Sequence, residues 1–210
     1  MDLYSAIYAR QTIRDFAARP VEAATLNKII QAGFAAPTNN HLREWHFVLL
    51  QDLQKRRDLL EQVIHPTTTK GATAIVNRWG LTDECQRELY INAIPKQFSM
   101  LADAPALILP FYHQPGALLK PKTQSDLNAF ASIWLCIENM LLAAAAEGIF
   151  GVTRIPFADE RKIVLDTLNI PTGYEFPCWL ALGYPADEAK RAEQVTIDPL
   201  TRIHVDTWKS

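Results

Sequence analysis

The chain has 210 residues, of which 49% are hydrophobic and 21% charged, so it can bury one globular core without structural metals or disulfides. Its formal net charge of −2 argues against a nucleic acid as the main partner, because polyanion binding needs an excess of lysine and arginine. A bound anion must therefore be held by a few local cations.

Two helices are predicted at the start of the chain. Apolar residues recur at helical spacing over residues 3–8, and Asp2 can serve as the N-cap. A second apolar stripe covers residues 26–34. It should end just before Pro37, because a proline disfavours helical geometry in the residue that precedes it.

A strand and a third helix are predicted next. Turn residues at 38–41 lead into the apolar run 45–50, which is typical of a strand covered on most sides. Asp52 then caps a helix that extends to Ile64. Residues 65–83 show no clear period, so we expect an irregular segment that is either mobile or a lid.

The middle of the chain carries two prolines inside otherwise regular patterns. Residues 84–101 have a helical pattern that Pro95 disturbs, and residues 106–112 are predicted to form a strand. Pro110 should push that strand to a sheet edge or end it, because proline cannot donate a ladder hydrogen bond.

A long apolar helix is predicted over residues 125–147, ended by Gly148. Its apolar stretch, 129–146, has nearly the length of a membrane span. Glu138 and Asn139 interrupt it, and an ionised glutamate at bilayer depth is costly. We therefore expect a buried helix of a soluble protein and no membrane partner.

The last predicted elements are a strand at 151–155, a helix at 158–168 and a strand at 178–183. Helices outnumber strands, and strict βαβ alternation is missing, so we predict an α+β fold with a mixed, mainly antiparallel sheet flanked by helices. Residues 1–210 form a single domain. Within it, 184–210 is a C-terminal extension whose apolar residues should pack on a second subunit.

The spacing of cysteines and histidines indicates the cellular compartment and whether a metal site is expected. The three cysteines (Cys85, Cys136 and Cys178) are widely separated, which fits thiols in a reducing cytoplasm. The first residues lack the basic and apolar regions of a signal peptide, so a cytoplasmic location is expected. The five histidines have no metal-ligand spacing, and we predict no metal.

Three polar segments could carry chemistry. Two guanidinium groups and a hydroxyl within residues 10–14 can form a phosphate cradle, although a solvated basic loop is an alternative. Residues 37–45 gather amides, an imidazole and a guanidinium at the entrance to a strand, although a self-bonded turn would look the same. Lys190 and Arg191 follow the last strand and, by themselves, are typical of a solvated charge pair.

Taken together, these segments resemble the FMN-dependent nitroreductase family, and the resemblance spans nearly the whole chain. That family has an Arg-x-Ser/Thr-x-Lys/Arg-x-Phe string after its first helix, then Ala-Pro-Ser and Trp-x-Phe before a strand. The matching residues here are Arg10, Thr12, Arg14, Phe16, Ala36-Pro37-Thr38 and Trp45-His46-Phe47, followed by Asp103-Ala104-Pro105, Glu138-Asn139, Glu147-Gly148 and Leu182-Gly183-Tyr184-Pro185.

The resemblance implies an intertwined homodimer with FMN in a cleft at the interface. Arg10, Gln11, Thr12 and Arg14 would hold the phosphate, with Arg14 alternatively near the N1/O2 edge of the ring. The partner chain would line the flavin with Thr38, Asn39, Asn40 and His41. Further contacts would come from the amide of Gln97, the backbone at Arg154 and Ile155, and the cations Lys190 and Arg191.

The implied activity is transfer of electrons from NADH or NADPH through flavin N5 to a small acceptor such as a nitroaromatic, a quinone or an enone. No acid–base dyad is required in the sequence, because the cofactor carries the chemistry. Two alternatives stay open: another reductive reaction such as dehalogenation, and a flavin-binding storage or sensor protein without significant turnover.

The chain departs from the family pattern at several positions. Arg43-Glu44-Trp45 stands where relatives often have Gln-Pro-Trp, Met100 where some have a flavin-contacting lysine, and Pro156 where glycine is common. Arg43 is therefore a candidate substrate residue that would favour anionic acceptors. The alternative is a structural role, with its guanidinium paired to Glu44 or another acid.

Overall fold

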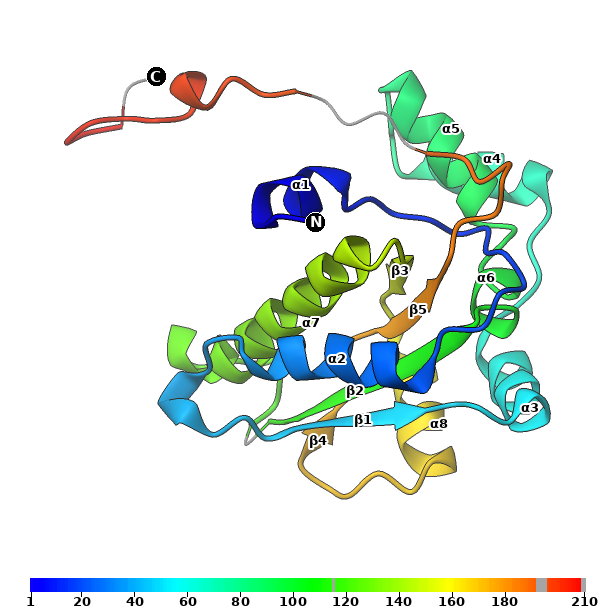
Figure 1. Cartoon of the computed structure of the whole chain (residues 1–210), viewed down its shortest axis with the longest axis horizontal. Helices are drawn as coiled ribbons and strands as arrows, with labels where there is room; N and C mark the ends of the chain where they lie inside the picture. Colours follow the sequence, from blue (N-terminus) through cyan, green and yellow to red (C-terminus); the bar gives the residue numbers. More distant parts are fainter. Residues whose placement is uncertain (115, 192–195, 209–210) are drawn as a thin grey trace.

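The computed structural model describes residues 1–114, 116–191 and 196–208, and its centre is a five-stranded antiparallel sheet (Figure 1). The strand order is β1-β2-β5-β3, and the short β4 pairs with the far end of β2. The strands are β1 (Trp45–Leu49), β2 (Ala106–His113), β3 (Phe150–Arg154), β4 (Tyr174–Glu175) and β5 (Trp179–Gly183). The α-helices are α1 (Leu3–Ala9), α2 (Ala23–Phe34), α3 (Leu53–Val63), α4 (Thr69–Arg78), α5 (Glu84–Ala93), α6 (Ser99–Ala102), α7 (Asn128–Ala146) and α8 (Ala158–Thr167), and the short 3-10 turns are η1 (Asn39–His41), η2 (Gln124–Leu127) and η3 (Pro199–Thr201).

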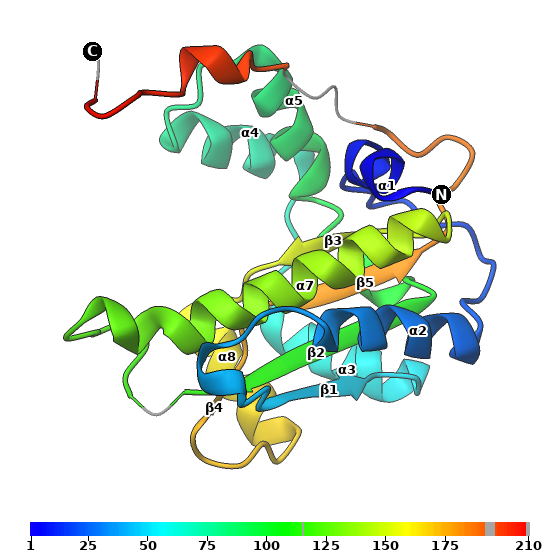
Figure 2. The same cartoon turned by 60° about the vertical axis from the view of Figure 1, so that its left-hand side comes forward.

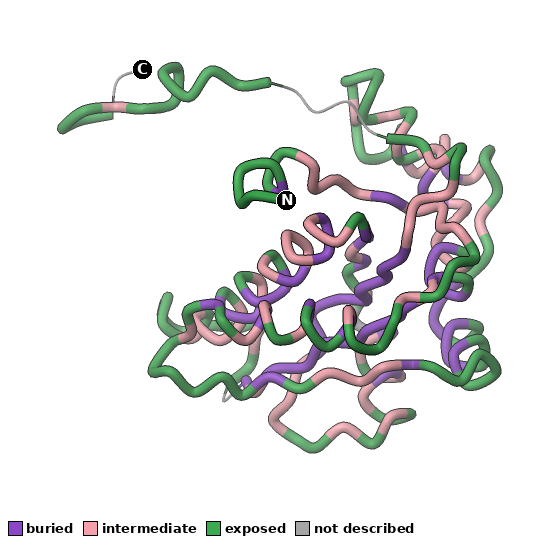
Figure 3. The backbone as a smooth tube through the Cα atoms, viewed as in Figure 1, coloured by how far each residue is buried: buried purple, intermediate pink, exposed green. Residues whose placement is uncertain are grey.

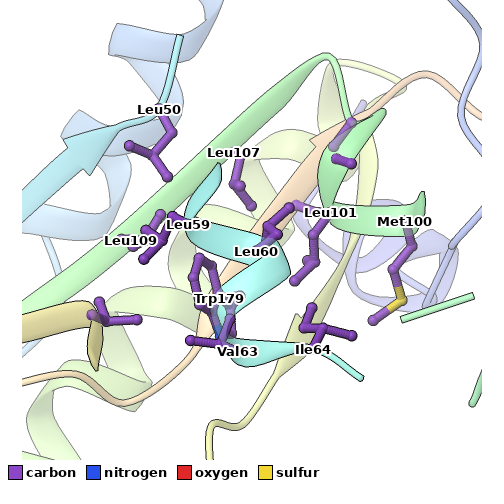
Figure 4. Packing of buried hydrophobic residues seen from close by; sticks show 14 of the residues in the cluster. Leu50, Leu59, Leu60, Val63, Ile64, Met100, Leu101, Leu107, Leu109 and Trp179 are labelled. Atoms are coloured by element: carbon purple, nitrogen blue, oxygen red, sulfur yellow. The ribbon is translucent and has the colours of Figure 1, made fainter. Parts of the chain in front are cut away.

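The sheet lies between two helical layers, as Figure 2 shows. Strand β2 explains this, because its side chains alternate between two buried faces. Ile108 and Tyr112 belong to the apolar cluster under α2 and α7, whereas Leu107 and Leu109 belong to the cluster under α3 and α8. In the second cluster α3 packs its leucines around Trp179 (Figure 4). The predicted α+β class and the antiparallel sheet are confirmed.

Pro110 neither ends β2 nor places it at an edge, so that prediction was wrong. Strand β2 continues to His113 and lies inside the sheet, with Pro110 opposite Phe47 of β1. On its other side β2 pairs with β5 only as far as Ile108 and with β4 only from Tyr112. Pro110 thus falls in the gap between two ladders, where a missing N–H donor costs little.

The segment 65–83 is not irregular, because it contains the ten-residue helix α4. Thr68 caps this helix by accepting a hydrogen bond from the backbone N–H of Gly71 at 3.2 Å. Helix α4 packs against α5 and buries Ala72 and Val76. The pattern expected over 84–101 is divided into α5 and α6 by the turn that contains Pro95, since proline interrupts helical hydrogen bonding.

Helix α7 packs on the sheet and α2 with one face, where Ile133, Ile137 and Met140 are fully buried. The helical stretch Gln124–Ala146 contains an 18-residue window with a mean hydropathy of 1.6 and is long enough to cross a membrane, which is also true of core helices in soluble proteins. Only part of this stretch is buried within the chain, and Leu135 is exposed (Figure 3).

Exposed apolar side chains gather at both ends of the chain (Figure 3). Helix α1 exposes Leu3, Tyr4, Ile7 and Tyr8, and Trp208 near the C-terminus is 83% exposed. Such residues normally lie in a core or in a protein interface. The other exposed apolar residues of the described tail are Ile197, Leu200, Ile203 and Val205.

Candidate functional site

The segment after α1 lies against β3 in an extended conformation. Thr12 forms a parallel bridge to Gly151, and the N–H of Ile13 donates to the Gly151 carbonyl oxygen at 3.1 Å. Ile13 is fully buried, whereas Thr12 and Arg14 are half-buried. Position 151 has no room for a side chain, because a Cβ there would lie 2.3 Å from the Ala181 carbonyl oxygen. Gly151 therefore permits the close approach of β3 to β5, and its carbonyl oxygen holds the segment that carries Thr12 and Arg14.

Three cations converge on one cleft of about 320 Å³ beside this segment. Arg14 lies on one side with Lys190 and Arg191, which follow β5. Helix α5 forms the opposite wall with Cys85, Glu88, Leu89 and Asn92, and Asp15 completes the lining. We name this space the cationic cleft. Arg14 is 176 residues from Lys190 in sequence, so the fold is needed to bring Arg14 to the adjacent Lys190 and Arg191.

Partial burial affects the charge of the cationic cleft. Desolvation lowers the pKa of the Arg14 guanidinium from its ordinary value, and the nearby Tyr90 and Asp15 act in the opposite direction. Both carboxylate oxygens of Asp15 already accept hydrogen bonds from Lys96, at 2.8 and 2.9 Å. Arg14 thus remains available for a bound anion, which would return some of the lost solvation.

Arg10 is placed differently from Arg14. It is the C-cap residue of α1, and its Nε lies 3.6 Å from a carboxylate oxygen of Glu138 on α7. The half-buried Gln11 connects it to the bridge at Thr12. Arg10 is not part of the lining of the cationic cleft. The structure therefore assembles Arg14, Lys190 and Arg191 and leaves Arg10 against α7.

Arg154 and Gln97 lie together, but their side chains bond each other. The Arg154 guanidinium forms two 2.6 Å hydrogen bonds with Glu160 and donates from Nε to Gln97 Oε1 at 2.9 Å. Arg154 and Glu160 are both buried. Of the predicted contacts here, the backbone of the exposed Ile155 and the amide nitrogen of Gln97 lie outside this network.

Glu160 is a residue that the sequence analysis missed. Besides pairing with Arg154, it accepts the N–H of Phe157 at 3.2 Å and so caps α8. An acidic residue three positions after a helix N-cap is a recognisable capping signal. Its pairing with Arg154 has no comparable signal in the sequence.

The loop 38–43 forms the second group of predicted residues. It contains the turn η1, and Asn40, His41 and Arg43 have positive φ angles of 53°, 56° and 46°. The backbone N–H of Asn39 donates to Ser132 Oγ of α7 at 3.3 Å. Asn40 and His41 are exposed. The loop is therefore anchored to the start of α7 and presents polar groups to the outside.

A second cleft, of about 450 Å³, lies beside this loop, and we name it the loop cleft. It is bounded by the ends of β1 and β2, by η2 and by the first turns of α7. Its lining includes four residues that the sequence analysis did not single out for a site, Tyr112, Asp126, Asn128 and Ser132. They are distant in sequence from the loop, and only the packing of α7 on the sheet brings them to it.

The side chain of Arg43 contacts α2. Its Nε donates to the carbonyl oxygen of Phe34, the last residue of α2, at 3.0 Å. The expected pairing with Glu44 is not what the structure has, since a Glu44 carboxylate oxygen lies 3.2 Å from His113 Nδ1. Arg43 thus bonds a free carbonyl at a helix C-terminus, where a cation is favourable.

The two groups of predicted residues lie apart in one chain. The loop 38–43 stands at the N-terminal end of α7, and the segment 10–14 lies beyond the middle of α7, on the side of β3 and α5 (Figure 1). One subunit therefore does not bring all the predicted cofactor residues around one ligand.

Comparison with known proteins identifies the family of this chain. The model of the "Nitroreductase family" matches residues 7–184. An iodotyrosine deiodinase of Nematostella vectensis is 27% identical over 207 residues, covering 97% of this chain and 74% of that protein.

Two solved structures share the fold. An oxidized iodotyrosine deiodinase bound to FMN and 3-iodo-L-tyrosine has a TM-score of 0.71 at 18% identity, covering 99% of this chain and 100% of the other. The NADPH:FMN oxidoreductase of Vibrio harveyi complexed with NAD+ has a TM-score of 0.68 at 20% identity. The match covers 99% of this chain and 78% of the other. The family match spans most of the chain, and this protein therefore belongs to the nitroreductase family of oxidoreductases.

Proposed function

We propose that this protein is an FMN-dependent oxidoreductase that takes electrons from NADH or NADPH and delivers them to a small electron-poor acceptor. The observation that carries the proposal is the convergence of Arg14, Lys190 and Arg191 on the cationic cleft. Three cations at one cleft fit a phosphate monoester better than a neutral ligand.

FMN would be held by the cations of the cationic cleft and by further residues outside its lining. Arg14, Lys190 and Arg191 would hold the phosphate, Thr12 would donate a hydroxyl, and Arg10 would add a cation from the side of α7. Bound FMN would supply hydride acceptance at N5 and electron transfer to the acceptor. The backbone N–H of Ile155 and the amide of Gln97 would bond the ring edge.

We further infer that the enzyme works as a homodimer, because a second copy would complete the site. In one chain the loop 38–43 lies away from the cationic cleft, as described above. A partner loop would bring Thr38, Asn39, Asn40 and His41 to the flavin. The exposed apolar residues of α1, of α7 and of the tail 196–208 fit the large apolar interface that an obligate dimer needs.

Two classes of compound are candidates for the natural electron acceptor. The family name supports a nitroaromatic or a similar acceptor, and the similarity to an iodotyrosine deiodinase supports reductive dehalogenation. A storage or sensor protein is the alternative from a different class. Steady-state assays of the FMN-loaded protein with NADH and NADPH separate the enzymes from the storage protein, and a panel of nitro, quinone and halogenated acceptors separates the two enzymes.

The test of the cofactor uses binding and chemical protection. We expect about one FMN per chain, and FMN at a hundredfold its Kd should stabilise the fold by roughly 2.7 kcal/mol. Cys85 lines the cationic cleft and is exposed, whereas Cys136 and Cys178 are buried. FMN should therefore slow the reaction of the single accessible thiol with a thiol reagent, and Cys85→Ala should abolish that reaction.

The opposite outcomes are equally clear. FMN that neither binds nor raises the melting temperature would overturn the proposal. Binding without protection of Cys85 would place the ligand elsewhere. Sedimentation tests the dimer: a soluble monomer at micromolar concentration would contradict it. Truncation after Arg191 keeps Lys190 and Arg191, so it separates loss of the tail from loss of the cations.

A further inference from the structure

The loop cleft holds a buried polar group that has no partner. Tyr112 is 1% exposed, and its hydroxyl has no hydrogen-bond partner among the described residues. A buried unpaired hydroxyl costs free energy, so its retention beside a cleft calls for an explanation. Tyr112 is one of the residues that line the loop cleft.

A second unpaired atom belongs to Gln114, the residue that follows β2. Gln114 is 5% exposed, and its Oε1 has no partner in the described part of the chain, whereas its Nε2 donates to the backbone oxygen of Asp126 at 3.0 Å. Asp126 itself lines the loop cleft. Gln114 itself is not part of the lining, so of these two unpaired groups the cleft is bounded by the Tyr112 hydroxyl, which can donate or accept.

The other polar groups of the loop cleft are mostly engaged with one another. Asn39 accepts from Asn128 Nδ2 at 3.4 Å, and its backbone N–H donates to Ser132 Oγ. Ser132 in turn donates to the Asn128 carbonyl oxygen at 2.7 Å. These bonds engage three donors of the lining: the Asn128 amide, the Asn39 backbone N–H and the Ser132 hydroxyl.

The charges point the same way. Asp126 accepts the backbone N–H groups of Lys122 and Thr123 at 2.7 and 2.9 Å, and these bonds hold the pKa of its carboxyl below the ordinary value. Glu44, which faces His113, adds a second carboxylate. Arg43 is turned to α2 through its bond to Phe34 and is not part of the lining. The described residues that line the loop cleft therefore include two carboxylates and no arginine or lysine.

We propose that the loop cleft is a subsite for the amine or amide arm of the electron-poor acceptor, with the Tyr112 hydroxyl bonding that arm. This rests on the proposed function, because the same loop would reach the partner's flavin in the dimer. The arm is a hydrogen-bond donor, either a neutral amide or an ammonium group. A carboxylate arm is disfavoured by the negative charges of Asp126 and Glu44.

The experiment measures binding to the oxidised holoprotein without a nicotinamide, so that no turnover occurs. The probes are 4-nitrobenzamide, 4-nitrobenzylamine, 4-nitrobenzoate and nitrobenzene, titrated by calorimetry. We expect the amide and the amine to bind about tenfold more tightly than the benzoate. Tyr112→Phe should weaken the amide and the amine by about five- to tenfold and leave nitrobenzene unchanged.

A second variant separates charge from hydrogen bonding. Glu44→Gln should weaken the amine and not the amide, because only the ammonium group responds to the lost carboxylate. The FMN content of each variant is measured first. Failure of the parent protein to bind FMN would overturn the proposed function. Normal FMN content with equal affinity of the parent for amide and benzoate would overturn this inference alone, and so would an unchanged amide affinity in Tyr112→Phe.

Discussion

The two walls of the cationic cleft belong to regions with very different packing. Arg14, Lys190 and Arg191 are attached to the central sandwich, whose two apolar clusters contain most of the buried core. The opposite wall is α5, part of the α4–α5 hairpin. Among the described residues, that hairpin is held by a small cluster in which only Ala72, Val76 and Ile94 are buried.

This difference shows how one chain can combine a fixed anion site with a movable wall. Local opening costs less where few apolar contacts are buried. Arg14 is held to β3 through the bridge at Thr12 and the buried Ile13, whereas Lys190 and Arg191 are exposed in the segment that follows β5. The α4–α5 hairpin can move away from the cleft at a smaller free-energy cost, and a ligand that bridges both walls should stabilise it.

The largest change in stability should come from a substitution in the core of the central sandwich. Ile108 is fully buried on the inner strand β2, so Ile108→Ala should lower the free energy of unfolding by about 2–5 kcal/mol. Urea denaturation followed by circular dichroism measures the change. A loss below about 1 kcal/mol would mean that the sandwich core relaxes around the cavity and is less tightly packed than described.

The next largest effect should come from removal of a predicted phosphate ligand, which should lower FMN affinity and leave the stability of the fold unchanged. Truncation of one partner of a desolvated charge pair costs about 2–5 kcal/mol, so Arg10→Ala and Arg14→Ala should weaken FMN binding by that amount. Arg57 is the matched control, because it forms a surface pair with Asp103 at 2.7 Å outside the cationic cleft. Equal FMN affinity in Arg10→Ala and Arg57→Ala would reject Arg10 as a phosphate ligand.

A smaller, local effect is expected in the hairpin. Ile94→Ala removes the same atoms as Ile108→Ala but from the small cluster, so it should speed amide hydrogen exchange in α4 and α5 while exchange in β2 and β5 stays unchanged. Added FMN should slow the hairpin exchange again. Uniform acceleration in the sheet as well would show that the hairpin and the sandwich unfold as one unit.

The smallest effect concerns Arg43. Because its Nε bonds the Phe34 carbonyl oxygen, we expect a structural role, and Arg43→Gln should leave FMN content and the ratio of kcat/KM for 4-nitrobenzoate over 4-nitrobenzamide unchanged. A guanidinium that bound the carboxylate instead would change that ratio about ten- to a hundredfold. A change of that size in the mutant would restore Arg43 as a substrate residue.

Much of the architecture could be predicted from local sequence signals. Period-two and period-3.6 patterns, the caps Asp2 and Asp52, and Gly148 after the long helix mark elements that depend on neighbouring residues. The motifs that resemble the nitroreductase family likewise lie in short stretches. Such signals were sufficient for the fold class, and the family match confirms the resemblance.

Tertiary structure decided the features that depend on distant residues. Helix α4 carries Gly71 and several β-branched residues, so its intrinsic helix propensity is low and packing on α5 stabilises it. Pro110 is tolerated inside the sheet because two partner strands leave a gap there.

The side-chain partners were decided in the same way. The bond of Arg43 to Phe34 and the pairing of Arg154 with Glu160 exist only once the helices are placed. The contents of both clefts also depend on residues far apart in sequence, because each cleft is formed where separate elements meet. Local patterns set the elements of this chain, and their packing set which polar groups face a ligand.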